Sequence, residues 1–301
     1  MSIQVSNVTK VYGEQKALDD VSFQVNKGEI LGFLGPNGAG KSTIMKIITT
    51  FIPPSEGTVS VCGFDILTQS MDVRKNVGYL PENNPLYLDM YVKEYLGFIA
   101  GLHKISGKQK RIEEMIGLTG LEREQHKKIG ALSKGYRQRV GLAQALIHNP
   151  DVIILDEPTS GLDPNQLADI RELIRAIGKE KTLMFSTHIM QEVEAICDRV
   201  IIINRGKIVA DGKADELSRQ QKRGFTIEVE FDKAFDINIL KKISGVKKVR
   251  TMKDFSFELV YEGEADIRPE IFKLAVEHQA TVLTINRKEL KLEEVFQQLT
   301  K

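Results

Sequence analysis

The chain has 301 residues, enough for one large domain or two ordinary ones, and its 42% hydrophobic and 28% charged residues are typical of a soluble globular protein. The formal net charge of +1 gives no reason to expect nucleic acid or an anionic membrane as a partner. We expect no signal peptide and no membrane helix, because no apolar run approaches the ~18 residues that a membrane span needs. Any membrane role is therefore expected to use a separate subunit. Cys62 and Cys197 lie far apart and outside any C-x-x-C pair, which predicts free thiols in a reducing compartment.

Two stretches at the start of the chain predict short antiparallel strands. They are Ile3–Tyr12 and residues 21–25, where Val21, Phe23 and Val25 alternate with polar residues. Tyr12 stands at the end of the first stretch. An exposed tyrosine there can stack on a purine ring, although a tyrosine in such a position is more often part of a core or an edge strand.

The most informative motif follows a predicted buried strand at residues 29–34 and precedes a predicted helix at residues 43–51. It fits the phosphate-loop pattern G-x-x-x-x-G-K-[ST], in which backbone N–H groups and the helix dipole bind phosphate. Lys41 can reach the β and γ phosphates, and the Ser42 hydroxyl can bind Mg²⁺. The alternative is a glycine-rich turn before an ordinary helix. The candidate nucleotide-binding residues are Gly35, Pro36, Asn37, Gly38, Ala39, Gly40, Lys41, Ser42 and Thr43.

The middle of the chain predicts a strand over residues 76–80 and then a helical region. Glu82 follows that strand, either as a metal or water ligand or as a solvated turn acid. Apolar residues recur at helical spacing between residues 86 and 131. Within this region, Leu86, Tyr87, Met90 and Tyr91 form either an exposed patch for a partner helix or part of a subdomain core.

A second helix N-terminus is predicted at Ser133, in the run Leu-Ser-Lys-Gly-Tyr, where Ser133 is a suitable N-cap. Ser133 and Gly135 at this tip can hold a phosphate or simply begin a capped helix. Residues 151–155 predict a buried strand that ends in Asp156 and Glu157. Carboxylates at such an edge face the ligand crevice, so Asp156 can hold Mg²⁺ and Glu157 can polarise a water molecule. His188 follows another buried strand, at residues 182–186, and is expected at the same edge.

The remaining pattern divides the chain. A turn at residues 160–164 precedes a helix from about Asn165, residues 200–212 predict a hairpin, residues 213–220 a helix and residues 221–224 a connector. Beyond residue 225 the order βαββαβ predicts a small ferredoxin-like domain, followed by a helix over residues 290–299. We therefore predict a nucleotide-binding domain at residues 1–221, with a helical subdomain at about 86–140, and an α+β accessory domain at residues 222–301.

The ordered set of motifs resembles the nucleotide-binding subunit of an ABC transporter over residues 2–220. The tail at residues 292–300 resembles the ABC-2-type exporter branch, and within it the whole chain looks most similar to the gliding-motility-associated ATP-binding subunit. The resemblance implies an α/β P-loop NTPase with an antiparallel β subdomain and a helical subdomain. It also implies an ATPase that powers export through a separate integral membrane permease. Such a subunit is cytoplasmic and peripheral on the inner membrane.

The resemblance also implies roles for individual residues. Tyr12 would stack on adenine, the phosphate loop would bind the ATP phosphates, and Ser42, Glu82 and Asp156 would hold Mg²⁺. Glu157 would be the general base and His188 would contact the γ-phosphate. In a head-to-tail homodimer, Ser133 and Gly135 would cap ATP held by the other copy, and Asp163 would cross the interface.

Three residues depart from the family pattern. Glu82 replaces glutamine at the strand end, and Lys134 and Tyr136 replace the first glycine and the glutamine of Leu-Ser-Gly-Gly-Gln. We expect ATP hydrolysis to survive with an altered rate or coupling. The alternative function is a soluble ABC-type ATPase acting on ribosomes or nucleic acid. That class usually has two cassettes in one chain or long coiled-coil insertions, and neither occurs in this sequence. A kinase or GTPase is disfavoured because no Asn-Lys-x-Asp motif is present.

Overall fold

A computed structural model describes residues 1–213, 217, 225–261, 263 and 265–288. Contacts within the chain define two compact units, residues 1–213 and residues 214–299. The predicted helix after Lys213, the connector at 221–224 and the predicted helix at 290–299 lie largely or wholly outside the described residues, as does the predicted boundary between residues 221 and 222. Within the described part of the chain, no helix is long and apolar enough to cross a membrane.

The first unit is built on a six-stranded sheet with the order β10-β9-β3-β8-β7-β6, in which only β10 is antiparallel to its neighbour. Every residue of β3, β7 and β8 is buried, as expected for parallel strands covered on both faces. The carboxyl ends of these three adjacent strands therefore meet at one edge. The strands are β3 (Ile30–Leu34), β6 (Val77–Leu80), β7 (Val152–Asp156), β8 (Thr182–Thr187), β9 (Arg199–Asn204) and β10 (Lys207–Gly212).

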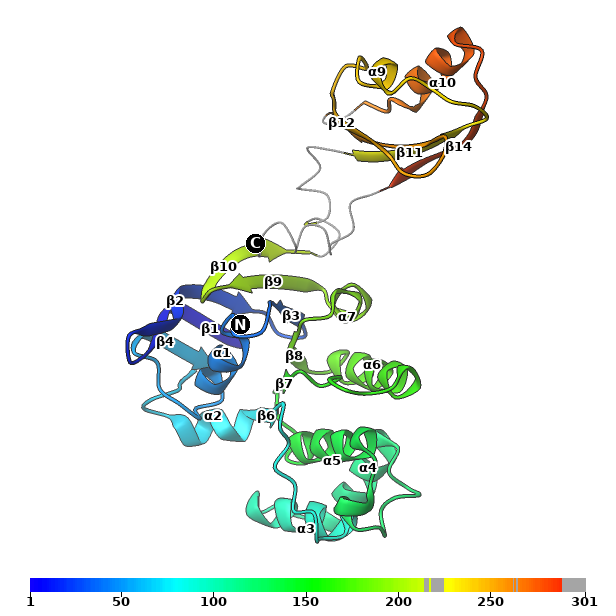
Figure 1. The fold of residues 1–301 in the computed structure, drawn as a ribbon. Coiled ribbons are helices and arrows are strands. Elements are labelled where there is room, and N and C mark those ends of the chain that lie inside the picture. Colours follow the sequence, from blue (N-terminus) through cyan, green and yellow to red (C-terminus); the bar gives the residue numbers. More distant parts are fainter. Residues whose placement is uncertain (214–216, 218–224, 262, 264, 289–301) are drawn as a thin grey trace. The chain divides into compact units, whose positions relative to one another are not determined.

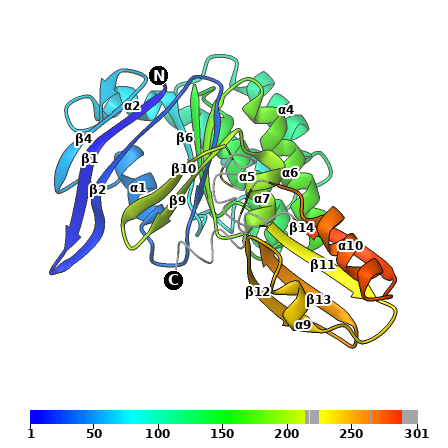
Figure 2. The same cartoon turned by 90° about the horizontal axis from the view of Figure 1, so that it is seen from above.

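An antiparallel sheet with the order β2-β1-β4-β5 lies beside the first. Helix α1 lies between the two sheets (Figure 2), and Ile44 and Ile47 of α1 share a core with Val5 of β1 and Ile154 of β7. The bounds are β1 (Ile3–Tyr12), β2 (Gln15–Val25), α1 (Lys41–Ile48), β4 (Glu56–Val61), β5 (Phe64–Asp65) and α2 (Ser70–Asn76). Helix α1 ends at Ile48, earlier than predicted, and Thr50 just beyond it has a φ of +63° that ends helical geometry.

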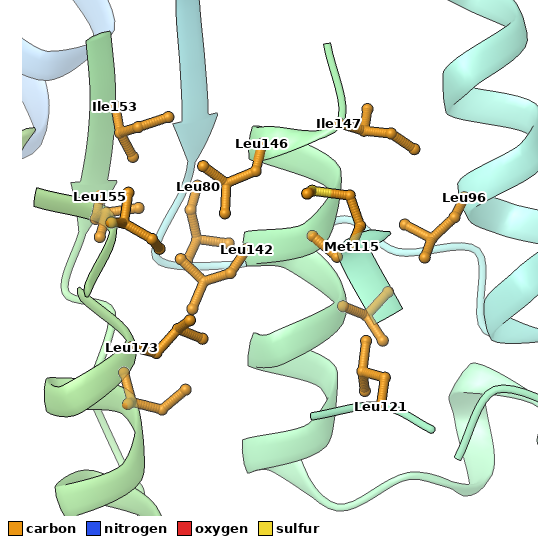
Figure 3. Close-up of a cluster of buried hydrophobic side chains, with 14 of the residues drawn as sticks. Leu80, Leu96, Met115, Leu121, Leu142, Leu146, Ile147, Ile153, Leu155 and Leu173 are labelled. Atoms are coloured by element: carbon orange, nitrogen blue, oxygen red, sulfur yellow. The ribbon is translucent and has the colours of Figure 1, made fainter. Parts of the chain in front are cut away.

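Helices cover the other face of the six-stranded sheet (Figure 1). Leu142 and Leu146 of α5 join the sheet residues Ile153 and Leu155 to Met115 of α4, so one core runs from the sheet into the helical region (Figure 3). The elements are α3 (Val92–Leu102), α4 (Lys108–Thr119), a 3₁₀ turn (Ile129–Ala131), α5 (Lys134–Leu146), α6 (Pro164–Gly178) and α7 (Met190–Ile196).

The second unit has an antiparallel sheet with the order β12-β13-β11-β14. Both of its described helices pack on one face (Figure 1), where Leu240, Ile271 and Ala275 join the buried side chains of the sheet. Counted within the unit, the strand order is 4-1-3-2, which confirms the ferredoxin-like prediction. The elements are β11 (Phe225–Phe231), α9 (Ile237–Leu240), β12 (Val246–Thr251), β13 (Ser256–Tyr261), α10 (Arg268–Glu277) and β14 (Val282–Lys288).

Candidate nucleotide site

The phosphate-loop segment joins β3 to α1, as the sequence predicted. Gly40 is the N-cap of α1 with a φ of +111°, and a Cβ there would lie 2.7 Å from the carbonyl oxygen of Ala17. Gly38 also has a positive φ, +77°. Only glycine adopts such conformations without strain, and no side chain caps the helix. The first N–H groups of α1 are therefore available to an anion.

Lys41 lies under this loop and is 6% exposed. Its Nζ donates hydrogen bonds to the carbonyl oxygens of Gly35 at 2.7 Å and Pro36 at 3.2 Å. The same Nζ lies 3.4 Å from Oε1 of Glu157. The Lys41 ammonium therefore contacts both sides of the site, the phosphate loop and the carboxylate that follows β7.

Asp156 and Glu157 are 2% and 6% exposed at the end of β7. Both depend on Ser186 of β8, which sequence analysis did not select. The Ser186 hydroxyl donates to Oδ1 of Asp156 at 2.6 Å and accepts the Glu157 N–H at 3.0 Å. The strand register explains this bridge, because Asp156 pairs directly with Ser186. Glu157 has a φ of +49°, a conformation uncommon for a non-glycine residue.

His188 contacts the same carboxylate. Its Nδ1 lies 2.8 Å from Oε2 of Glu157, so the two oxygens of Glu157 face two different cations or donors, Lys41 and His188. The backbone around His188 is held by Thr187. The Thr187 hydroxyl donates to Oε2 of the fully buried Glu192 at 2.6 Å and accepts the Ile189 N–H at 3.0 Å.

A cleft of about 250 Å³ lies over the phosphate loop. Its lining is polar and includes Glu82, which is exposed at the end of β6. Ala17 of β2 was not predicted, because no local pattern marks a residue that reaches the site from another sheet. The lining residues are Ala17, Asn37, Gly38, Gly40, Lys41, Ser42, Thr43, Glu82 and Glu157.

Nine predicted site residues do not line this cleft. Gly35, Pro36, Ala39, Asp156 and His188 belong to the loop and to the strand ends beside it, and the other four belong to β1 and to the N-termini of α5 and α6. Tyr12 is 50% exposed at the end of β1, with Nζ of Lys10 5.3 Å from the centre of its ring. Ser133 is the N-cap of α5 and accepts the Tyr136 N–H at 3.4 Å, and Gly135 lies in the first turn. Asp163 is the N-cap of α6. Side-chain contacts thus join the loop, Glu157 and His188, whereas the tips of α5 and α6 contribute no residue to the lining of the cleft.

The four apolar residues before α3 are divided between core and surface. Leu86 is 9% exposed and Met90 packs against the core, whereas Tyr87 and Tyr91 are 55% and 48% exposed. A hollow of about 520 Å³ lies close by, between the ends of α1, α3 and α5 and the segment after β6. Its lining includes Phe51, Tyr79, Pro85, Leu102 and His148.

The predicted magnesium ligands are compatible with an ion shared with a nucleotide. Among the described residues, no group of three or more His, Cys, Asp or Glu side chains is arranged to hold a metal ion. Ser42 and Glu82 line the cleft and Asp156 lies at the same sheet edge, so a hydroxyl and carboxylates are offered from one side. Mg²⁺ is typically held by one or two carboxylates together with substrate phosphates, which fits this donor set.

Comparisons with known proteins agree with this geometry. Residues 18–160 match the ABC transporter family. The bacitracin transport ATP-binding protein BcrA of Bacillus licheniformis is 32% identical over 302 residues, which cover 99% of this chain and 96% of that protein. The Nod factor export ATP-binding protein I of Burkholderia orbicola is 36% identical over 75% of this chain and 76% of its own. A solved dimeric ATP-binding cassette in a post-hydrolysis state, bound to ADP and Pi, superposes with a TM-score of 0.65 at 28% identity, over 70% of this chain and 98% of its own. The chain therefore belongs to the ABC transporter family, as one of its ATP-binding and ATP-hydrolysing subunits.

Proposed function

We propose that this chain is the ATPase of an ABC-2-type exporter. It drives transport through a separate integral membrane permease, to which it binds on the cytoplasmic face of the inner membrane. The observation that carries the catalytic part is the carboxylate of Glu157, held between Lys41 and His188 above the phosphate loop. Export is supported by the relatives, one named for bacitracin transport and one for Nod factor export.

In this proposal each chain binds ATP and Mg²⁺ through its own residues. Tyr12 stacks on adenine, and the N–H groups of residues 35–43 bind the phosphates. Ser42, Asp156 and Glu82 hold Mg²⁺, which when bound polarises the phosphate oxygens. Before the nucleotide binds, the Lys41 ammonium is engaged by carbonyl oxygens and by Oε1 of Glu157. Phosphate oxygens replace these partners, and Oε1 is then free to accept a proton from water.

The site is completed by a second copy. Ser133, Gly135 and Asp163 stand at helix tips that do not line the cleft of their own chain. In a head-to-tail dimer, Ser133 and Gly135 cap the γ-phosphate held by the other copy, and Asp163 crosses the interface. ATP binding closes the dimer and hydrolysis reopens it.

The substitution Glu157→Gln tests the assigned base. It keeps the size of the side chain but removes its basicity, so we expect ATP binding to persist, hydrolysis to fall by about 10² to 10⁴-fold, and an ATP-dependent dimer to accumulate. Size-exclusion chromatography and phosphate release measure the two effects. Glu180→Gln, at an exposed position beyond α6, is the control and should behave as wild type. Normal turnover in Glu157→Gln would show that another group is the base.

The membrane partner is proposed to dock on the hollow near α3. Leu102, at the end of α3, is 64% exposed and lines that hollow. Leu102→Asp should reduce co-purification with a membrane protein while leaving ATP binding intact, because a buried unpaired charge is costly at an interface. Leu118→Asp on α4, where the leucine is 44% exposed outside the hollow, is the matched control. Co-purification with ribosomes instead would favour the soluble ATPase.

Two narrower proposals concern the pathway and the second unit. Gliding motility is proposed from the resemblance of the whole chain, and deletion of the gene should abolish spreading of cells on a surface. The ferredoxin-like unit has a core of its own, which suits a structural role in supporting the dimer. Removal of residues 224–301 should then weaken dimerisation or transport. If both are unchanged, that role is wrong.

A further inference from the structure

The nucleotide cleft has an excess of negative charge. Its lining includes one cation, Lys41, and two carboxylates, Glu82 and Glu157, and a third carboxylate, Asp156, lies at the same sheet edge. Lys41 is already engaged with Glu157 at 3.4 Å. Glu82 is exposed, and within the described parts of the chain no hydrogen bond or ion pair of its side chain is found. A bound triphosphate adds further negative charge to this site. The Mg²⁺ proposed to bind between the phosphates and Ser42, Asp156 and Glu82 would offset only part of that charge, so the site keeps a negative excess.

A cation with no evident role stands at the tip of α5. Lys134 is the first residue of this helix, is exposed, and makes no hydrogen bond or ion pair with the described residues. A lysine there opposes the helix dipole, at a cost of about 0.3 to 1 kcal/mol, and no acidic residue in the first turn compensates it. The position of Lys134 is therefore unfavourable for the helix itself.

The Lys134 side chain has a defined place on the surface. It packs against Gly161: a Cβ placed on this glycine would lie 2.3 Å from Nζ of Lys134 and 3.4 Å from its Cε. Gly161 has a φ of +69° and belongs to the loop before Asp163. The ammonium is thus carried between the two helix tips, those of α5 and α6, that the proposed dimer presents to the other copy.

We propose that Lys134 carries its charge into the nucleotide site of a second copy, where it offsets the negative charge of Glu82. The inference rests on the head-to-tail dimer of the proposed function and goes beyond it by pairing two residues across the interface. Neither Glu82 in the cleft nor Lys134 at the tip of α5 has a hydrogen bond or ion pair with the described residues. Their charges are opposite, so the cleft and the helix tips that would cover it are electrostatically complementary. Each copy thus supplies a second cation to the nucleotide site of the other copy.

The first test measures the charge coupling. In the Glu157→Gln background, the ATP concentration that gives half-maximal dimer is determined by light scattering. We expect Lys134→Met to raise that concentration about tenfold when Glu82 is present and at most about threefold in a Glu82→Gln chain. Lys110→Met, at an exposed position on α4, should leave it unchanged. An equal effect of Lys134→Met in both backgrounds overturns the pairing.

The second test shows whether the charges act between copies. When a Lys134→Met chain pairs with a Glu82→Gln chain, one site keeps both charges and the other has neither. When a wild-type chain pairs with a doubly substituted chain, each site keeps only one charge. Fluorescence energy transfer between differently labelled chains should therefore detect dimer at lower ATP in the first mixture than in the second. The reverse order would place both effects within one chain and overturn the proposal.

The two tests also distinguish failure of the dimer from failure of the pairing. If Glu157→Gln forms no ATP-dependent dimer at all, the dimer and the pairing both fail. A dimer that forms without charge coupling overturns the pairing alone.

Discussion

Ser186→Ala is the sharpest test of how the catalytic carboxylates are positioned. The Ser186 hydroxyl is fully buried and connects the last residue of β7 to the residue that follows it, through Oδ1 of Asp156 and the N–H of Glu157. Removing it deletes a hydrogen bond to a carboxylate, worth about 1.5 to 3 kcal/mol, and leaves a buried N–H without a partner, at a cost of about 1 to 3 kcal/mol. Because the two losses overlap, we expect the free energy of unfolding to fall by about 2 to 4 kcal/mol, out of a total of about 5 to 15 kcal/mol.

Activity should fall as well, because both carboxylates lose their common anchor. A displacement of about 1 Å in a catalytic group costs up to about 10²-fold in rate, so ATP hydrolysis at saturating ATP should drop by about 10 to 100-fold. Urea unfolding and phosphate release measure the two effects on the same preparation.

Thr182→Val is the matched control. Thr182 is 1% exposed at the start of β8, the strand that also contains Ser186. Its Oγ1 accepts the Gly28 N–H at 3.0 Å and lies 2.8 Å from Oγ of Ser2. Its loss should cost comparable stability without changing turnover. If Ser186→Ala hydrolyses ATP at the wild-type rate while losing as much stability as Thr182→Val, the hydroxyl does not position the carboxylates and this reasoning is wrong.

Two further predictions use residues with clear physical constraints. Gly40→Ala places a side chain on a residue with positive φ and against the carbonyl oxygen of Ala17, so nucleotide binding should be lost, as measured by titration with a fluorescent nucleotide. The control Gly117→Ala in α4, where an added Cβ meets no atom within 4 Å, should raise the free energy of unfolding by about 0.5 to 1 kcal/mol, as measured by thermal unfolding. Burial, together with the neighbouring His103, lowers the pKa of His148 from 6.5 to about 4. The folded state therefore prefers the neutral ring. The contribution of His148 to the free energy of unfolding is complete above pH 6.5 and is lost as the pH falls towards 4. After discounting for partial exposure, this should amount to roughly 1 kcal/mol. His148→Asn should flatten that part of the stability profile, and the exposed control His126→Gln should not.

The parts of the fold that follow from local pattern were predictable. Ser133 is an N-cap because a short polar side chain satisfies a free N–H there, and the structure confirms the bond to Tyr136. The buried strands were predicted from short apolar runs. The ferredoxin-like unit was predicted from strand and helix patterns that follow one another in the order βαββαβ. Helices α2 and α7 were not predicted, since each has only seven residues and too few turns for a clear period.

The parts that depend on neighbours in space were not predictable. Ser186 matters because β8 pairs with β7 in a register that sets it against Asp156, 30 residues earlier. Ala17 reaches the cleft from the antiparallel sheet. Leu86 and Tyr87 are adjacent and were grouped in one apolar patch, yet Leu86 is buried and Tyr87 is exposed, because the packing around α3 and α5 decides which side chain faces the core.

The hydrogen bonds already made at the helix tips limit what each tip can offer to a second copy. The Ser133 oxygen accepts the N–H of Tyr136, but its O–H remains available as a donor, which suits a phosphate oxygen. Asp163 uses Oδ1 to accept the N–H groups of Asn165 and Gln166, and its other oxygen can only accept. A carboxylate is repelled by phosphate, so Asp163 must face N–H or hydroxyl donors. The two tips therefore have different partners across the proposed interface: Ser133, beside Lys134, is the one suited to the nucleotide, and Asp163 is suited to the protein that surrounds it.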